Sequence, residues 1–142
     1  MMNSSQNIIR SNKEDIYPKY DLILFNSKQK IQNVTHLDED LFIFTDFSGI
    51  LESSFKEIKK NNNHRKIIGN DFTINFFRDH RPSSNFILKI YGKAGVAELI
   101  ELAKIYNWQI YNLTTNQMIH FNKNQTANLI PISKNFKNIK LL

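Results

Sequence analysis

Two short stretches decide the fold of this chain: residues 72–76 read FTINF, and residues 86–90 read FILKI. In each stretch a large apolar residue stands at every second position, as in a strand that buries one face. The segment between them, Arg78 to Ser84, contains Pro82 and two serines and predicts a hairpin loop. The two stretches therefore form an antiparallel hairpin, which is the most secure element of the sequence.

The opposite face of this hairpin carries a mixture of aromatic, aliphatic and charged side chains: Phe77, Ile87, Lys89 and Tyr91. If nothing covers it, a sheet face with exposed aromatic residues is a binding surface. If the C-terminal tail or another chain covers it, that interpretation disappears.

The segment before the hairpin predicts one strand and one helix. Tyr20 to Phe25 is apolar on both faces and indicates a central strand. Residues 41–44 are ambiguous, since they suit either an extra strand or the first turns of a helix. From Phe47 onward the apolar residues fall at helical spacing, with Lys59 and Lys60 at the predicted C-terminal end and Asn61 to Asn63 as the stop. The stripe comprises Phe47, Ile50, Leu51, Phe55 and Ile58, with Thr45, Asp46 or Ser48 as the N-cap.

After the hairpin, the chain predicts a second helix and two short strands. The helix buries Val96, Leu99, Ile100 and Ala103 and ends near Asn107. Residues 108–111 and 118–121 are the strands, joined by a turn at residues 114–117. The predicted class is α+β, a two-layer sandwich whose mainly antiparallel sheet has two helices on one face in split βαβ, ferredoxin-like order.

Length and composition support one domain in a reducing compartment. The chain has 142 residues, 4 glycines, 3 prolines and no cysteine, so a disulfide framework and a thiolate metal site are excluded. We expect a polar N-terminal tail at 1–18, a single α/β domain at 19–122, and a C-terminal tail at 123–142 that packs on or extends the domain. No signal peptide or membrane span is visible, and we expect a cytoplasmic protein with no membrane contact.

The net charge of +6 is unevenly distributed along the chain. Residues 1–52 carry 5 basic and 8 acidic side chains, residues 53–104 carry 10 and 5, and residues 105–142 carry 4 and none. The basic second half invites a nucleic-acid-binding interpretation, whereas the acidic first third suits a basic protein partner.

No motif in the sequence predicts catalysis. The four histidines stand in four separate segments without an HExxH pattern, and the acidic run after His36 lacks the glycine turn of a calcium loop. The glycines form no phosphate-binding loop, and no serine stands in a GxSxG elbow. We therefore expect no catalytic residue, no metal site and no cofactor, so that an enzyme is the weakest hypothesis.

Two groups of charged residues are candidates for binding a partner. The first is acidic and comprises Asp38, Glu39, Asp40, Asp46 and Glu52. The second lies at the predicted hairpin tip and comprises Arg78, His80 and Arg81. The arginines could contact phosphates or a partner's carboxylates, and a solvated turn explains them equally well.

Several segments from Gly69 onward resemble a known type of protein. They are residues 69–79 (GNDFTINFFRD), 81–85 (RPSSN), 90–93 (IYGK), 99–104 (LIELAK) and 107–111 (NWQIY). This pattern, over about half the chain, is similar to small bacterial immunity proteins of polymorphic toxin systems, including contact-dependent growth inhibition.

The resemblance implies a cysteine-poor cytoplasmic α/β domain that binds and neutralises one toxin domain. It implies no enzymatic activity, and the partner would be the C-terminal domain of a cognate toxin. If that toxin is a nuclease, its basic cleft would favour the acidic group of residues as the docking patch. The alternative hypothesis is a nucleic-acid-binding module that uses the basic second half of the chain. The sequence does not indicate an oligomeric state.

Overall fold

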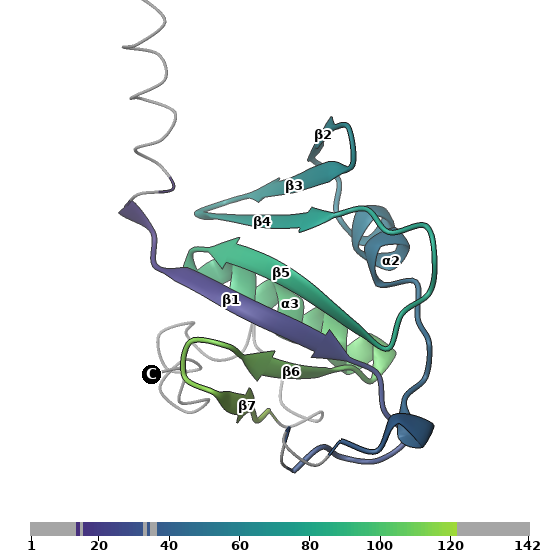
Figure 1. Ribbon diagram of the computed structural model, residues 1–142. Coiled ribbons are helices and arrows are strands. Elements are labelled where there is room, and N and C mark those ends of the chain that lie inside the picture. The colour runs from purple at the N-terminus through teal and green to yellow at the C-terminus, as the bar shows by residue number, and fades with distance from the viewer. Residues whose placement is uncertain (1–13, 15, 33, 35–36, 122–142) are drawn as a thin grey trace, which may run out of the picture.

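The structure, a computed structural model, describes residues 14, 16–32, 34 and 37–121. Two helices, α2 (Phe47–Ser54) and α3 (Lys93–Tyr106), lie on one face of a single antiparallel sheet (Figure 1). The sheet has the order β2-β3-β4-β5-β1-β6-β7. The strands are β1 (Lys19–Phe25), β2 (Ile58–Asn61), β3 (His64–Gly69), β4 (Phe72–Phe77), β5 (Asn85–Tyr91), β6 (Gln109–Asn112) and β7 (Gln117–Ile119).

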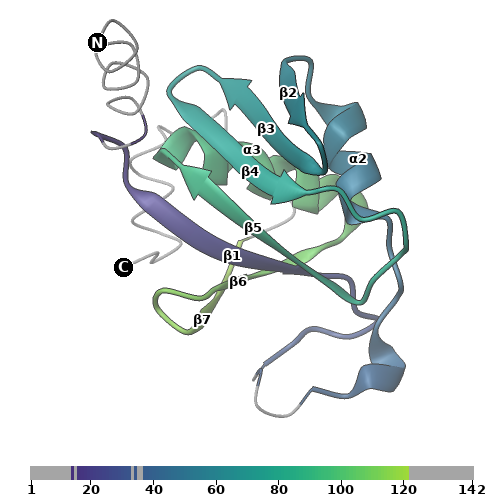
Figure 2. The same ribbon diagram turned by 45° about the horizontal axis from the view of Figure 1, so that its top comes forward.

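The central hairpin is confirmed. Strands β4 and β5 pair antiparallel, and their alternate apolar residues are buried in the main core: Phe72, Ile74, Phe76, Phe86, Leu88 and Ile90. Strand β1 is central as predicted, because it pairs with β5 on one side and with β6 on the other. Figure 2 shows the same sheet from a second direction, with both helices behind it.

Helix α3 follows the sequence prediction closely. All four residues of its predicted stripe are buried, and it ends at Asn107, whose φ of 63° is the left-handed conformation that stops a helix. Trp108 follows immediately and is 2% exposed, with its ring 5.0 Å from that of Phe47 on α2. The contact between Trp108 and Phe47 joins the two helical regions over the sheet.

Helix α2 is shorter than predicted, and the region after it is a correction. The helix ends at Ser54, and the residues that we expected to continue and stop it form the hairpin β2–β3. Asn62, with φ of 55°, is in the hairpin turn. An asparagine in the left-handed conformation suits a hairpin turn as well as a helix stop. The prediction that Asn61 to Asn63 end a helix is therefore wrong, because they lie at the turn of a hairpin.

The ambiguous residues 41–44 form neither a named strand nor helix α2. Leu41 is the last residue of a 3-10 turn, Glu39–Leu41, and Phe42 makes one isolated bridge to Ser27. Of the three candidate caps, Asp46 is the N-cap of α2, and its Oδ1 accepts from Gly49 N at 3.1 Å.

The α+β class with an antiparallel sheet and two helices is confirmed. The split βαβ, ferredoxin-like order is not confirmed, and the sheet is larger than predicted because the hairpin β2–β3 extends it at one edge. The predicted C-terminal tail and most of the N-terminal tail lie outside the described residues. Over the described part of the chain, no helix has the length and apolar character needed to span a membrane.

Candidate interaction site

The connection from β1 to α2, residues 26–46, is fastened to the sheet along the part that the structure describes. Asn26 donates to Thr45 Oγ1 at 2.9 Å and accepts from Ile43 N at 2.8 Å. Thr45 exchanges two backbone hydrogen bonds with Ser83, at 2.9 and 3.0 Å. The segment before α2 therefore has a defined path, tied to β1 at one end and to the β4–β5 loop at the other.

This connection exposes carboxylates and apolar side chains next to one another in the sequence. Asp38 caps the 3-10 turn by accepting from Asp40 N at 3.1 Å, and all three carboxylates of residues 38–40 face solvent. Ile43 is 41% exposed and Phe44 is 69% exposed. A preorganised loop with exposed apolar side chains beside charges is suited to protein binding. We call residues 38–46 the acidic loop.

Glu52 belongs to a different arrangement, because its carboxylate lies among three cations. Its Oε1 is 3.2 Å from Arg65 Nε and 3.5 Å from Lys60 Nζ, and its Oε2 is 3.3 Å from Arg78 Nη1. Only 16% of the Glu52 side chain is exposed. These pairs join α2 to β2, β3 and the end of β4, so Glu52 has a structural role that its position in the sequence does not reveal.

The loop between β4 and β5 is held against the start of α2. Ser48 is buried, and its Oγ donates to Asp79 O at 2.9 Å and accepts from Asp79 N at 3.1 Å. Arg78 approaches Asp46 Oδ1 at 3.9 Å, which brings two of the predicted site residues together. His80 and Arg81 are exposed and make no ion pair with the described residues.

The sheet face that points away from the helices, here called the outer face, is covered unevenly by the described residues. Over β1, β6 and β7, the β1–α2 connection packs a small apolar cluster onto it, and Phe42 stacks on Phe25 at 5.7 Å. Beyond β1, the described residues add the Glu14 carboxylate, which contacts Thr73 and Lys66, but no further apolar cover. Phe77 at the end of β4 is 68% exposed and Ile87 on β5 is 62% exposed.

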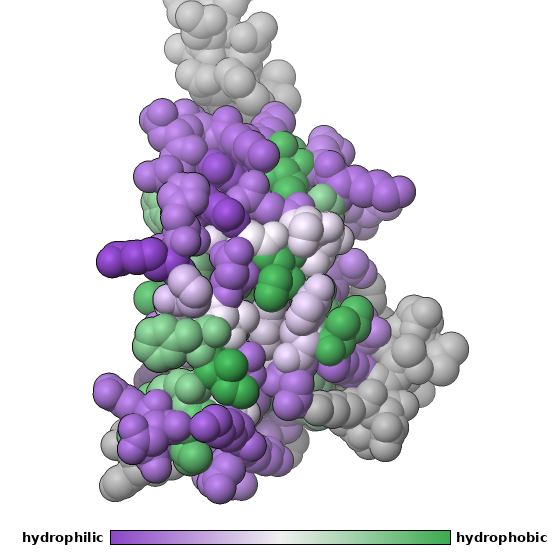
Figure 3. All heavy atoms as spheres, turned by 90° about the vertical axis from the view of Figure 1, so that its right-hand side faces the viewer, coloured by the Kyte–Doolittle hydropathy of each residue, from purple (hydrophilic) through white to green (hydrophobic). Residues whose placement is uncertain are grey.

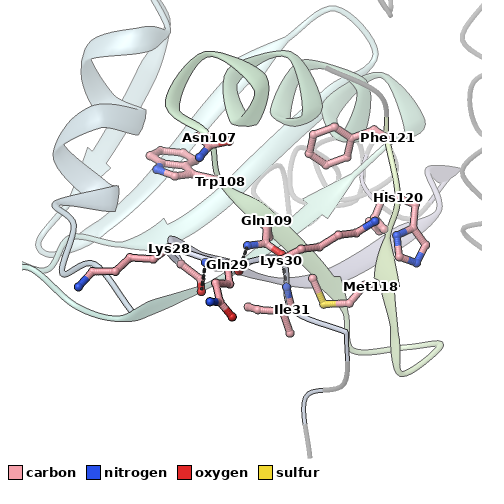
Figure 4. A pocket seen from close by; sticks show the side chains of 12 residues that line it. Lys28, Gln29, Lys30, Ile31, Asn107, Trp108, Gln109, Met118, His120 and Phe121 are labelled. Atoms are coloured by element: carbon pink, nitrogen blue, oxygen red, sulfur yellow. Dashed lines mark hydrogen bonds between the residues drawn. The ribbon is translucent and has the colours of Figure 1, made fainter. Parts of the chain in front are cut away.

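A pocket of about 290 Å³ lies between the β1–α2 connection and strands β6 and β7. Figure 4 shows the Gln109 side chain in this pocket. Its amide is hydrogen-bonded to the backbone of the β1–α2 connection: Oε1 accepts from Ile31 N at 2.7 Å, and Nε2 donates to Gln29 O at 3.0 Å. Lys28, Lys30 and His120 also line it, without a carboxylate among the lining residues. The charged residues of the described lining are therefore all basic.

The described histidines do not converge. His64 contacts Phe77 on the outer face, His80 is in the β4–β5 loop, and His120 follows β7. His36 lies outside the described residues. Within the described ranges, no three His, Cys, Asp or Glu side chains are placed to hold a metal ion.

The structure divides the eight predicted binding residues into three places. Asp38, Glu39 and Asp40 lie on the acidic loop, while Asp46, Glu52 and Arg78 take part in ion pairs around α2. His80 and Arg81 stand at the tip of the β4–β5 loop. Figure 3 shows that hydrophobic side chains also reach the surface on this side of the molecule, between hydrophilic ones.

Sequence reasoning missed two features of this region. It did not identify Ile43 and Phe44 as exposed, because an apolar run of four residues normally predicts a buried segment. It also does not pair Glu52 with Arg65 and Lys60, because Lys60 is predicted at a helix end and no strand is predicted at Arg65. The spacing Ile58, Lys60 against Arg65, Ile67 is the signal that would have found the second hairpin.

No family model, curated protein or solved structure matches this chain.

Proposed function

We propose that this protein neutralises a bacterial toxin domain by stoichiometric protein–protein binding, as the immunity proteins that it resembles do. The observation that carries this proposal is the acidic loop, where Ile43 and Phe44 are exposed on a connection fixed by hydrogen bonds to β1 and to the β4–β5 loop. An exposed aromatic side chain on an ordered loop loses little conformational entropy when it is buried by a partner.

The charge of this loop indicates the chemistry of the partner. Asp38, Glu39 and Asp40 are exposed and form no ion pair with the described residues. Carboxylates at the rim of an apolar contact accelerate association with a basic surface and disfavour an acidic one. A nuclease toxin, whose substrate cleft is basic, is the partner that fits this loop.

The test is co-expression of this protein with the toxin domain encoded beside its gene, followed by purification of the complex. We expect cells to survive and the two chains to elute together at a 1:1 ratio. Death of the cells despite intact immunity protein, or separate elution, would remove the proposal.

Two variants test the docking surface itself. Phe44→Ser removes the most exposed apolar side chain of the acidic loop, and we expect it to weaken toxin binding by about tenfold or more. The matched control is Ile105→Ser on α3, where an isoleucine that is 74% exposed lies on the helical side of the sheet. Equal binding by both variants would show that the acidic loop is not the contact surface.

A nucleic-acid-binding module is the second candidate. The observation that favours it is the combination of Phe77 with Lys66 and Lys89 on the outer face, since aromatic and cationic side chains together bind single strands. It predicts affinity for a generic oligonucleotide that falls steeply as salt rises from 50 to 200 mM. A flat titration at low salt would dispose of this candidate.

A further inference from the structure

We infer that the uncovered end of the outer face is a second contact surface for the same toxin domain, and that the toxin presents carboxylates to it. This surface, the hairpin patch, has Phe77 and Ile87 at its centre, with His64 against Phe77 and Lys89 on the same face of β5 as Ile87. His80 and Arg81 in the loop that joins β4 to β5 are counted with it. The inference rests on the proposed function, because it assigns the hairpin patch to the same partner.

The apolar centre continues a row of side chains that the protein itself covers farther along. Cross-strand pairing places Ile87 beside Ile23, Ile23 beside Tyr111, and Tyr111 beside Met118. Ile23, Tyr111 and Met118 are packed under the β1–α2 connection, whereas Ile87 is not. The row therefore has an apolar cover over β1, β6 and β7 and lacks one among the described residues over β4 and β5.

Phe77 extends this surface on the other side of the hairpin. The last pair of the β4–β5 ladder is Asn75 with Lys89, and the two strands separate from there toward the loop (Figure 1). Phe77 and Ile87 flank this separation. The ring of Phe77 meets His64 of β3 edge-on, at 5.5 Å between centroids. Phe77 and Ile87 are each more than half exposed, so this part of the outer face presents large apolar side chains to solvent.

The rim of the hairpin patch is cationic. Lys89 and Arg81 are exposed and form no ion pair with the described residues, while Lys66 pairs with Glu14 at 3.3 Å. Asp79 is an exposed carboxylate in the loop, and its Oδ1 accepts from Arg81 N at 3.0 Å, so the lysines and Arg81 outnumber the carboxylates near them only slightly. Asp21 is the acidic residue beside Lys89 across the strands, and it lies 3.9 Å from Lys19. Charge complementarity therefore calls for a partner surface with carboxylates around an apolar centre.

Other occupants fit this surface less well. Two copies of the chain placed face to face would bring the cationic rims of both hairpin patches together, which costs free energy. A single-stranded nucleic acid would find one widely exposed ring beside an aliphatic centre, whereas single-strand binding uses several aromatic rings on which successive bases stack. An acidic protein surface can bury the apolar centre and also place carboxylates beside the cationic side chains of the rim.

The sign of the rim constrains how the toxin is inhibited. A cleft that binds nucleic acid is basic, so it cannot be the part of a nuclease toxin that covers Lys89 and Arg81. The hairpin patch would thus contact the toxin outside its substrate cleft, while the acidic loop approaches the basic part. Together the two surfaces orient the toxin by charge.

The experiment measures the dissociation constant of the purified toxin domain for four forms of this protein. Phe77→Ser and Ile87→Ser each truncate an exposed side chain and should raise Kd by about tenfold or more, whereas Ile105→Ser on α3 should leave it within about twofold. Lys89→Glu should slow association, with an effect that shrinks at high salt. Thermal melts of each variant check that the fold is retained.

Each outcome decides the inference. Unchanged Kd for both apolar variants overturns it and leaves the proposed function standing, whereas no binding by the wild-type protein overturns both. Tighter binding by Lys89→Glu would show that the toxin is basic at this surface, against the inference. Loss of oligonucleotide binding or of a dimer in Phe77→Ser, with toxin binding intact, would assign the hairpin patch to nucleic acid or to a second copy.

Discussion

Replacing Glu52 with glutamine keeps the size of the side chain and removes the charge that three cations share. Arg65 and Arg78 would keep their positions beside an uncharged amide, although only 12% and 22% of their side chains are exposed. Removing one partner of a fully buried ion pair costs about 3–5 kcal/mol, and an exposed pair contributes about 0–1 kcal/mol.

The Glu52 cluster lies between those limits. Lys60 is 62% exposed and can turn to solvent, so the cost comes mainly from the two arginines. We therefore expect Glu52→Gln to lower the free energy of unfolding by about 2 kcal/mol. With a urea m-value of about 1–3 kcal/mol per molar for a domain of this size, the unfolding midpoint should fall by roughly 1 M.

Urea unfolding followed by circular dichroism measures this shift. The control is Glu98→Gln on α3, an exposed carboxylate without an ion pair to the described residues, for which a change within about 0.5 kcal/mol is expected. If the midpoints of Glu52→Gln and Glu98→Gln agree, the three cations do not hold α2 against β2 and β3, and the reasoning is wrong. Toxin binding by Glu52→Gln should stay unchanged, which separates this residue from the acidic loop.

Three further changes test other parts of the fold. Asp46→Ala removes the N-cap of α2 and should cost about 1 kcal/mol in urea unfolding. Gly92→Ala should cost more, about 2 kcal/mol, because φ is 101° and a Cβ there would meet the backbone oxygen of Asp71; a melting temperature equal to wild type would refute this. Burial raises the pKa of Tyr20 above its ordinary value of 10.0, so its phenol ionises first in the unfolded chain and the stability that it contributes below pH 10.0 is lost as pH rises further. Between pH 9 and 11 the stability of the wild type should therefore fall more steeply than that of Tyr20→Phe, and equal slopes would refute a role for Tyr20.

Periodicity predicted the elements that bury one clear face. Strands β4 and β5 and helix α3 repeat apolar residues at spacings that only one conformation can bury, so local sequence was enough to place them. The segment after α2 has no such constraint. Asn61 to Asn63 suit either a helix stop or a hairpin turn, and the choice is made by β4, whose free edge pairs with β3 through six residues. Partner strands that are distant in the sequence decide such cases.

The candidate site was predictable in type but not in arrangement. The acidic residues in the first third of the chain are a group in the sequence only, because in the structure Glu52 faces Arg65 while Asp38 to Asp40 face solvent. That division depends on the β2–β3 hairpin, which places Lys60 and Arg65 on the helical side of the sheet. An error in one local element therefore carried over into the predicted docking patch.

The overall charge of +6 is a poor guide to what a partner meets on this protein. Around α2, Arg65, Arg78 and Lys60 are balanced largely by Glu52 and Asp46, so these residues contribute to the total and little to the field outside. At physiological salt, electrostatic interactions are screened over about 8–10 Å, so a partner interacts with the charges beside the contact rather than with the net charge of the protein. At the acidic loop those charges are carboxylates, and at the hairpin patch they are Lys89 and Arg81. A uniformly basic nucleic-acid-binding protein has no need for exposed apolar side chains on two surfaces of opposite charge. A protein that holds one folded partner in one orientation gains specificity from two such surfaces, because each of them matches a different part of the partner.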